Sequence, residues 1–145
     1  MTIDYQALVD PAREITAAID RGLHQHNLEQ LGNETLNRYA ALAVVARNKM
    51  GEMIGGIHGE LVWDWLSIET LWVREDHRGQ GVGSTLLVEI ERHALSRGFT
   101  NSQVETTDFQ ALDFYRQHGY CVFGRLEGKP AGHTYYYLKK KLTAE

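Results

Sequence analysis

Residues 73–87 read VREDHRGQGVGSTLL, and three glycines, Gly79, Gly81 and Gly83, alternate within this stretch. An aliphatic run precedes the glycines, and a run with helical spacing follows them. Glycine reaches backbone conformations that other residues avoid, and it costs backbone entropy on folding. The stretch therefore predicts a strand, then a tight turn, then a helix whose first turn lies close to another group.

Composition excludes several classes of protein. The 145 residues are 43% hydrophobic and 23% charged, which suits one globular domain over residues 1–145. A net charge of −4 without a basic block argues against a nucleic-acid partner. The single cysteine, Cys121, excludes an internal disulfide, and no spacing of His or carboxylate residues indicates a metal site.

The N-terminal residues lack the basic and apolar regions of a signal peptide. No apolar run approaches the roughly 20 residues that cross a membrane. We therefore expect a cytoplasmic protein that has no membrane partner.

The first third of the chain predicts short helices. Residues 2–6 favour a strand. Asp10 and Pro11 then suit the N-cap and first position of a helix, which we expect to end near Gly22. Residues 24–32 favour a second helix that ends at Gly32.

The remaining chain predicts strands around two helices. Strands are expected at 39–47, 53–62, 65–73, 102–107, 120–127 and 133–142. Leu86, Leu87, Ile90 and Ala94 form one apolar stripe, so a helix follows the glycines. A second helix runs from an Asp108 cap to about Gln117. This order predicts a mixed α/β domain around one sheet.

A helix that opens after a glycine turn presents unpaired N–H groups to an anion such as phosphate. The stretch lacks the Gly-Lys-Ser/Thr end of a P-loop, and its glycine spacing fits a dinucleotide fingerprint poorly. The spacing of Arg78, Gly81 and Gly83 fits a third pattern, Arg/Gln-x-x-Gly-x-Gly/Ala. The structural alternative is a tight strand-to-helix turn that carries a surface arginine.

Residues 71–87 and 106–120 together resemble the GCN5-related N-acetyltransferase (GNAT) family. In the second segment, TTDFQALDFYRQHGY, a helix tyrosine, Tyr115, precedes the pair Gly119-Tyr120. The resemblance covers roughly residues 39–141. It implies a mostly antiparallel sheet of six or seven strands with about four helices, in which the fourth and fifth strands splay apart. The chain departs from many members at Asp108, where they carry Asn.

The resemblance also implies that acetyl-CoA is a co-substrate bound in the gap between the splayed strands. The pantetheine arm would pair with the free strand edge. The pyrophosphate would lie on the N–H groups of the glycine turn. The implied cofactor-binding residues are Leu71, Trp72, Val73, Arg78, Gly79, Gln80, Gly81, Val82, Gly83, Ser84 and Asp108.

Two residues are candidates for the proton transfers of an acyl transfer. The resemblance makes Tyr115 the general acid; packing in the core is its structural alternative. Glu69 lies among aliphatic residues, so we expect it to be partly buried, to share a face with Leu71 and Val73, and to act as the general base. A surface ion pair is the alternative for Glu69, and Glu105 is the rival base.

The predicted function is transfer of an acetyl group from acetyl-CoA to a primary amine of a small molecule. An acetyltransferase that acts on a peptide or protein amine is one alternative. A non-catalytic acyl-CoA-binding sensor or interaction module is another. Exposed sheet edges also make a homodimer an alternative to the monomer.

Overall fold

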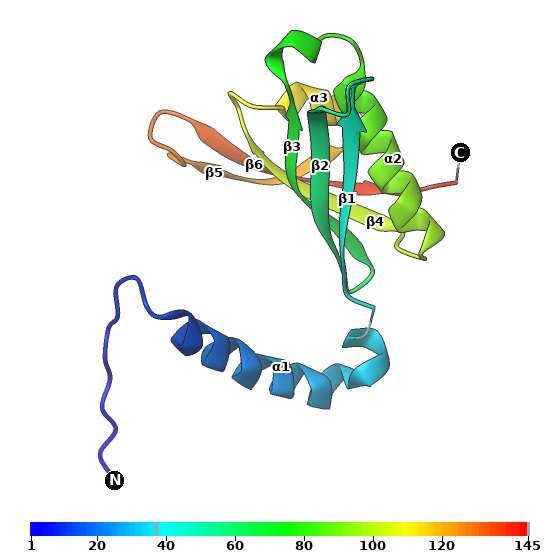
Figure 1. Ribbon diagram of the computed structural model, residues 1–145. Helices are drawn as coiled ribbons and strands as arrows, with labels where there is room; N and C mark the ends of the chain where they lie inside the picture. The colour runs from blue at the N-terminus through cyan, green and yellow to red at the C-terminus, as the bar shows by residue number, and fades with distance from the viewer. Residues whose placement is uncertain (37, 145) are drawn as a thin grey trace. The chain divides into compact units, whose positions relative to one another are not determined.

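The computed structural model describes residues 1–36 and 38–144, which fall into two separate units (Figure 1). Residues 1–36 form the first unit and residues 38–144 the second. No helix within these ranges is both long and apolar enough to span a bilayer. The second unit contains the sheet and every feature of the candidate site. The expectation that residues 1–145 form a single acyltransferase domain remains a prediction.

The first unit consists of an irregular segment and the helix α1 (Arg13–Leu36). The expected strand at residues 2–6 is wrong, because an isolated extended segment has no stability without a partner strand. The expected end near Gly22 is also wrong: α1 continues through it, since one interior glycine costs only about 1 kcal/mol. The expected break at Gly32 is confirmed by its non-helical φ of 79° and ψ of 164°.

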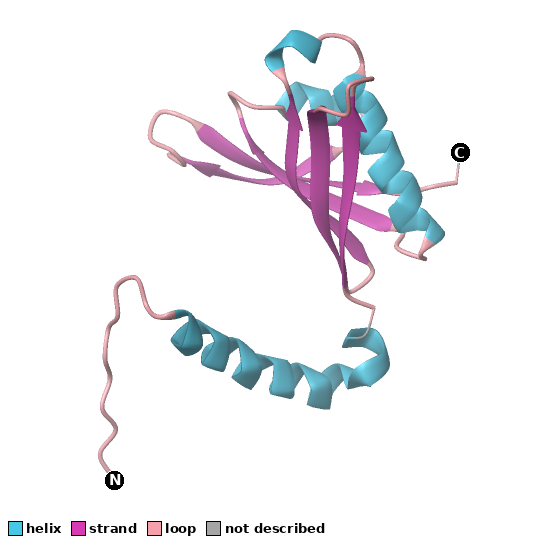
Figure 2. Ribbon diagram, in the orientation of Figure 1, coloured by secondary structure: helices cyan, strands magenta, loops and turns pink. Residues whose placement is uncertain are grey.

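The second unit contains a six-stranded sheet in the order β1-β2-β3-β4-β6-β5. Figure 2 shows its strands in magenta and the helices in cyan. Its strands are β1 (Ala40–Arg47), β2 (Met53–Val62), β3 (Trp65–Val73), β4 (Asn101–Thr107), β5 (Cys121–Glu127) and β6 (Thr134–Lys141). The neighbouring strands are antiparallel except β3 and β4, which are parallel. The helices of this unit are the 3₁₀ turn η1 (Glu75–His77), α2 (Val82–Ser96) and α3 (Leu112–Gln117). The predicted fold class is therefore confirmed.

The core lies between the sheet and α2, which runs along β1, β2 and β3 (Figure 1). The predicted apolar stripe of α2 is confirmed, and its four residues are buried to within 3% of full burial. They pack with Ile57, Leu61 and Leu66 from β2 and β3. Burying one such side chain stabilises the fold by about 1.5–3 kcal/mol, so this stripe holds α2 in a fixed position on the sheet.

The sheet parts between β3 and β4. The two strands pair only over residues 65–68 of β3 and 101–104 of β4. Beyond Ile68 and Val104 the strands are no longer bonded to each other, and β4 continues its pairing with β6 up to Thr107. The family resemblance predicted this splay between its fourth and fifth strands, at residues 65–73 and 102–107. They are β3 and β4 here because residues 2–6 do not form a strand. The C-terminal half of β3 thus has a free edge.

Candidate functional site

A cleft of about 600 Å³ occupies the parting between β3 and β4. Leu71 and Val73 contribute side chains from the core face of β3, and Glu69 and Trp72 contribute from the opposite face. Because side chains of both faces line it, the cleft passes from one face of the sheet toward the other. The complete lining is Glu69, Thr70, Leu71, Trp72, Val73, Arg78, Val104, Glu105, Thr106, Gln110, Ala111 and Tyr115.

The cleft continues into a hollow of about 350 Å³ at the N-terminus of α2. Leu71, Val73, Arg78 and Ala111 line both parts, so the two spaces adjoin. The rest of this hollow is lined by His77, Gly79, Gly81, Val82, Gly83, Ser84 and Phe114. Of the eleven predicted cofactor-binding residues, nine therefore line the cleft or its extension; Gln80 and Asp108 line neither.

The first turn of α2 has unpaired backbone donors. Its N-cap is Gly81, which is left-handed with φ 80° and ψ 8° and provides no side-chain cap. The earliest helical bond runs from the N–H of Thr85 to the carbonyl of Gly81. The N–H groups of Val82, Gly83 and Ser84 therefore have no partner within the helix. Together with the positive end of the helix dipole, these donors are suited to an anion.

The two polar side chains of this turn differ in their partners. The Nε of Arg78 donates to the carbonyl oxygen of Val73 at 2.9 Å, which anchors the guanidinium beside the end of β3. Within the described chain, the terminal nitrogens of Arg78 have no hydrogen-bond partner. They are suited to an anion at the α2 turn. The side chain of Gln80 instead turns back toward the carbonyl of Asp76.

Two contacts connect the first turn of α2 to α3. A Cβ at Gly83 would lie 3.6 Å from Cε1 of Phe114, an ordinary van der Waals distance, so the Phe114 ring lies directly against the first turn of α2. Beside this contact, the Oγ of Ser84 lies 2.9 Å from Nε2 of His118. The ring of His118 also packs on the ring of Phe114, with centroids 4.7 Å apart. Phe114 and His118 thus hold α3 against the first turn of α2.

Tyr115 lies on α3 and lines the cleft, although only 3% of the residue is exposed. Its ring packs edge-on against the rings of Phe114 and Tyr120. Burial raises the pKa of the Tyr115 hydroxyl to about 12. The group is therefore protonated at neutral pH, which is the state that a proton donor needs.

Glu69 occupies a β-bulge in β3. His58 of β2 pairs with Thr70 and Gly59 pairs with Ile68, so Glu69 has no residue opposite it. A Cβ at Gly59 would lie 2.2 Å from the carbonyl oxygen of Ser67, which only glycine permits. The bulge reverses the alternation: Ile68 faces the core, and the next residue that does so is Leu71.

The bulge overturns two expectations for Glu69. The carboxylate does not share a face with Leu71 and Val73, because the extra residue shifts the alternation by one. It is also not buried: the side chain is 47% exposed and its Oε2 lies 3.4 Å from Nδ1 of His58. Glu69 nevertheless lines the cleft, so the structure brings it together with Tyr115 in one cavity.

A second carboxylate, Glu105, lines the same cleft from β4. Glu69 and Glu105 also line an adjoining hollow of about 280 Å³ that includes Tyr135 of β6. The Tyr135 hydroxyl donates to Oε2 of Glu105 at 2.8 Å, and burial together with this bond raises the pKa of Tyr135 to about 12. The sequence left two readings of Tyr135 open, an aromatic wall for a substrate or alternating strand burial, and its place beside Glu105 follows from the β4–β6 pairing.

Asp108 has a different role from the one expected. Its carboxylate accepts from the N–H of Thr134 at 3.0 Å and lies 2.9 Å from Nδ1 of His133. The bond from Thr134 lowers the pKa of the carboxyl, and the neighbouring His133 lowers it further. The expected cap on α3 is wrong: the helix starts only at Leu112, and its N-cap, Ala111, donates its N–H to the hydroxyl of Thr106. Asp108 ties the end of β4 to the start of β6.

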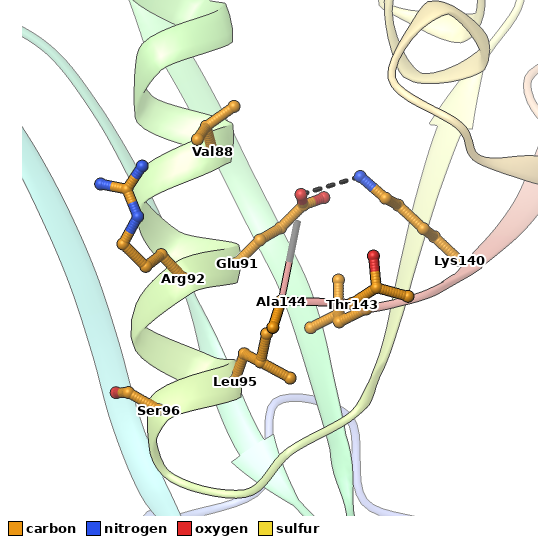
Figure 3. Close-up of a pocket in the computed structure, with 9 residues that line it drawn as sticks. Val88, Glu91, Arg92, Leu95, Ser96, Lys140, Thr143 and Ala144 are labelled. Atoms are coloured by element: carbon orange, nitrogen blue, oxygen red, sulfur yellow. Dashed lines mark hydrogen bonds and ion pairs between the residues drawn. The ribbon is translucent and has the colours of Figure 1, made fainter.

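A hollow of about 650 Å³ between α2 and the C-terminal segment is separate from the cleft (Figure 3). Its polar centre is Glu91, whose carboxylate accepts from Nζ of Lys140 at 2.9 Å and from the hydroxyl of Tyr120 at 2.8 Å. The Tyr120 hydroxyl also bonds to Ser102 at 2.7 Å. Every polar atom of this group has a partner, so the network connects α2 to β4 and β6 as structure. Within the described residues, no cluster of three or more His, Cys, Asp or Glu could hold a metal ion.

Comparisons with known proteins agree with this geometry. Residues 9–120 match the family model of the acetyltransferase (GNAT) family. A blasticidin-S acetyltransferase of Streptomyces morookaense is 41% identical over 101 residues, which cover 69% of this chain and 74% of that protein. An acetyltransferase of Agrobacterium fabrum is 30% identical over 88% of this chain and 91% of that protein.

The crystal structure of an acetyltransferase from Bacillus cereus matches with a TM-score of 0.86 and 32% identity. The match covers 94% of this chain and 98% of the Bacillus protein. The fold, the matched family model and the relatives all indicate the same family. The chain belongs to the GNAT family of acetyltransferases and is an acyl-CoA-dependent N-acyltransferase.

Proposed function

We propose that this enzyme transfers an acetyl group from acetyl-CoA to a primary amine of a small molecule, by direct attack of the amine on the thioester. One observation carries the proposal: a single cleft extends from the unpaired N–H groups of α2 to Tyr115 and the carboxylates Glu69 and Glu105. A molecule with a pyrophosphate at one end and a thioester at the other would fill this cleft.

The residues of the cleft fit acetyl-CoA. The N–H groups of Val82, Gly83 and Ser84, with the guanidinium of Arg78, would hold the pyrophosphate. The free edge of β3 over residues 71–73 would pair with the amide groups of pantetheine in the manner of an added strand. These contacts would hold the thioester in the parting of the sheet, where the reaction would gain chiefly from proximity.

The transfer needs two proton movements. An alkyl ammonium has a pKa of roughly 10.4, so the amine must lose a proton before its nitrogen forms a bond to the acetyl carbon. A carboxylate of the cleft, Glu69 or its rival Glu105, accepts that proton directly or through a water. The second movement carries a proton from the acylated nitrogen to the sulfur: as the carbon–sulfur bond breaks, the Tyr115 hydroxyl donates to the leaving sulfur and regains a proton from the nitrogen through water. The products are the N-acetyl amide and CoA.

The lining of the acceptor side favours a cationic small molecule. Glu69 and Glu105 attract an ammonium group, and the side chains of Trp72 and Tyr135 offer apolar faces beside them. The blasticidin-S acetyltransferase, to judge from its name, acts on a small antibiotic molecule, which supports the same class of acceptor for this chain. Cytoplasmic location and a homodimer stay predictions.

Release of CoA from acetyl-CoA, followed with a thiol reagent, tests the proposal against a panel of small amines, peptides and neutral alcohols. We expect release with small cationic amines and acetylated products of the matching mass. Tight CoA binding without release in the presence of any amine would refute catalysis and favour the sensor. Faster release with peptides would favour the alternative acceptor.

A further inference from the structure

The bond between Ser84 and His118 joins the first turn of α2 to the end of α3, two segments that are 34 residues apart in the chain. Ser84 belongs to the first turn of α2 and lines the anion-binding hollow. His118 follows the last residue of α3, three positions after Tyr115. The bond is partly buried, so water competes for it less than at an open surface.

The position of α3 depends on such contacts. The helix has only six residues, and a helix of this length has little stability in isolation. Its start is held by the bond from Ala111 to Thr106, and its side by the packing of Phe114 against Gly83. The Ser84–His118 bond is the polar contact that ties its end to α2.

We propose that His118 is a positioning residue for acetyl transfer, which holds Tyr115 at a set distance from the pyrophosphate-binding turn through Ser84. This inference rests on the proposed function. Paired with the edge of β3 as an added strand, the pantetheine arm is extended and its span is set, so a donor at the thioester must keep its distance from the phosphate site. The Ser84–His118 bond fixes the corresponding distance between α2 and α3 in the protein.

The bond does not depend on one protonation state of the imidazole. A neutral Nε2 accepts from the Ser84 hydroxyl, whereas a protonated Nε2 donates to the Ser84 oxygen. The role is therefore mechanical, and a side chain with a polar atom at the Nε2 position should replace it. Glutamine has such an atom, and leucine fills similar space without one.

The kinetic test compares His118→Gln and His118→Leu in the wild-type and the Tyr115→Phe backgrounds. A hydrogen bond of this kind corresponds to about a 3- to 10-fold effect, so we expect His118→Leu to lower kcat by this factor. His118→Gln should stay within about twofold of wild type. In the Tyr115→Phe background, His118→Leu should change kcat no further, because the hydroxyl that it positions is already absent.

The same fold loss in both backgrounds would overturn the proposal, and so would equal losses for the Gln and Leu variants. Either result would make His118 a packing residue. Thermal unfolding of each variant checks that the compared proteins are folded.

Hydrogen exchange provides a measurement without turnover. We expect free CoA to slow amide exchange over residues 79–85 and 112–118 of wild type. In His118→Leu the protection of residues 79–85 should remain, while that of 112–118 should fall. Equal protection of 112–118 in wild type and His118→Leu would refute the role of His118 alone. If CoA protects neither segment of wild type, the proposed function fails and the inference fails with it.

Discussion

Replacing Tyr115 by Phe removes one oxygen from the cleft and keeps the buried ring. The ring provides the packing against Phe114 and Tyr120, so we expect the fold and most CoA binding to survive. Any loss of rate then measures what the hydroxyl does for the leaving sulfur.

The structure sets the size of that loss. The pKa of Tyr115 is about 12, whereas a thiol has a pKa of about 8.5. Complete proton transfer from the phenol to a free thiolate is thus uphill by about 5 kcal/mol. The hydroxyl therefore acts mainly as a hydrogen-bond donor to the developing charge, which contributes about 1.5–3 kcal/mol. We expect kcat to fall by about 10- to 100-fold, with little change in KM for acetyl-CoA.

Steady-state kinetics with an accepted amine checks this value. Because the hydroxyl stays protonated well above neutral pH, the ratio of wild-type to variant kcat should be constant between about pH 7 and pH 10. Tyr120→Phe is the matched control: it removes a neighbouring hydroxyl that bonds to Ser102 and Glu91, and should lower stability rather than kcat. A Tyr115→Phe enzyme with normal kcat would refute the role of the hydroxyl.

Three further perturbations address the rest of the site. Glu69→Gln and Glu105→Gln test which carboxylate is the base. The variant that lacks the base should lose about 10²-fold in kcat near neutral pH and recover as free amine increases with pH. If the pH–rate profiles of both variants run parallel to that of wild type, water accepts the proton instead. Gly81→Ala should weaken the CoA affinity measured by calorimetry at least fivefold, about the factor for loss of one hydrogen bond. Gly51→Ala is the control, because Gly51 has a similar positive φ and open space around it. Equal CoA affinities of the two variants would exclude the α2 turn as the pyrophosphate site. The lowered pKa of Asp108 means that its stabilisation is present above the unfolded pKa of about 3.9 and is lost as pH falls below it. The difference in melting temperature between wild type and Asp108→Asn should therefore shrink below about pH 4, and a constant difference would contradict this linkage.

Local patterns predicted the frame of the site well. The bounds of β2 and β3 follow from runs of apolar residues between turn residues, and they are confirmed residue by residue. The stripe on α2 is confirmed because its spacing is a property of one helix. The left-handed Gly81 at the start of α2 likewise agrees with a local requirement of the turn.

Contacts between distant segments were not predictable from one sequence. The bulge at Glu69 depends on Gly59 in the neighbouring strand, so residues 65–73 alone do not predict it. Asp108 is a residue type that is typical of helix N-caps, but its hydrogen-bond partners lie 25 and 26 residues later in the chain. Single residues could therefore be assigned to the site, whereas their orientations required the pairing of strands.

The bulge in β3 acts as a phase shift in a two-residue repeat. Upstream of Glu69 the even-numbered residues, such as Leu66 and Ile68, face inward, and downstream the odd-numbered Leu71 and Val73 do. Deleting Glu69 would remove the bulge and restore a regular two-residue repeat, in which Leu71 and Val73 still face inward and Thr70 and Trp72 outward. The extra residue therefore adds one outward side chain to the cleft without changing which of its neighbours face the core. An ungapped alignment with a chain that lacks the extra residue would match its inward side chains to the outward ones of this protein.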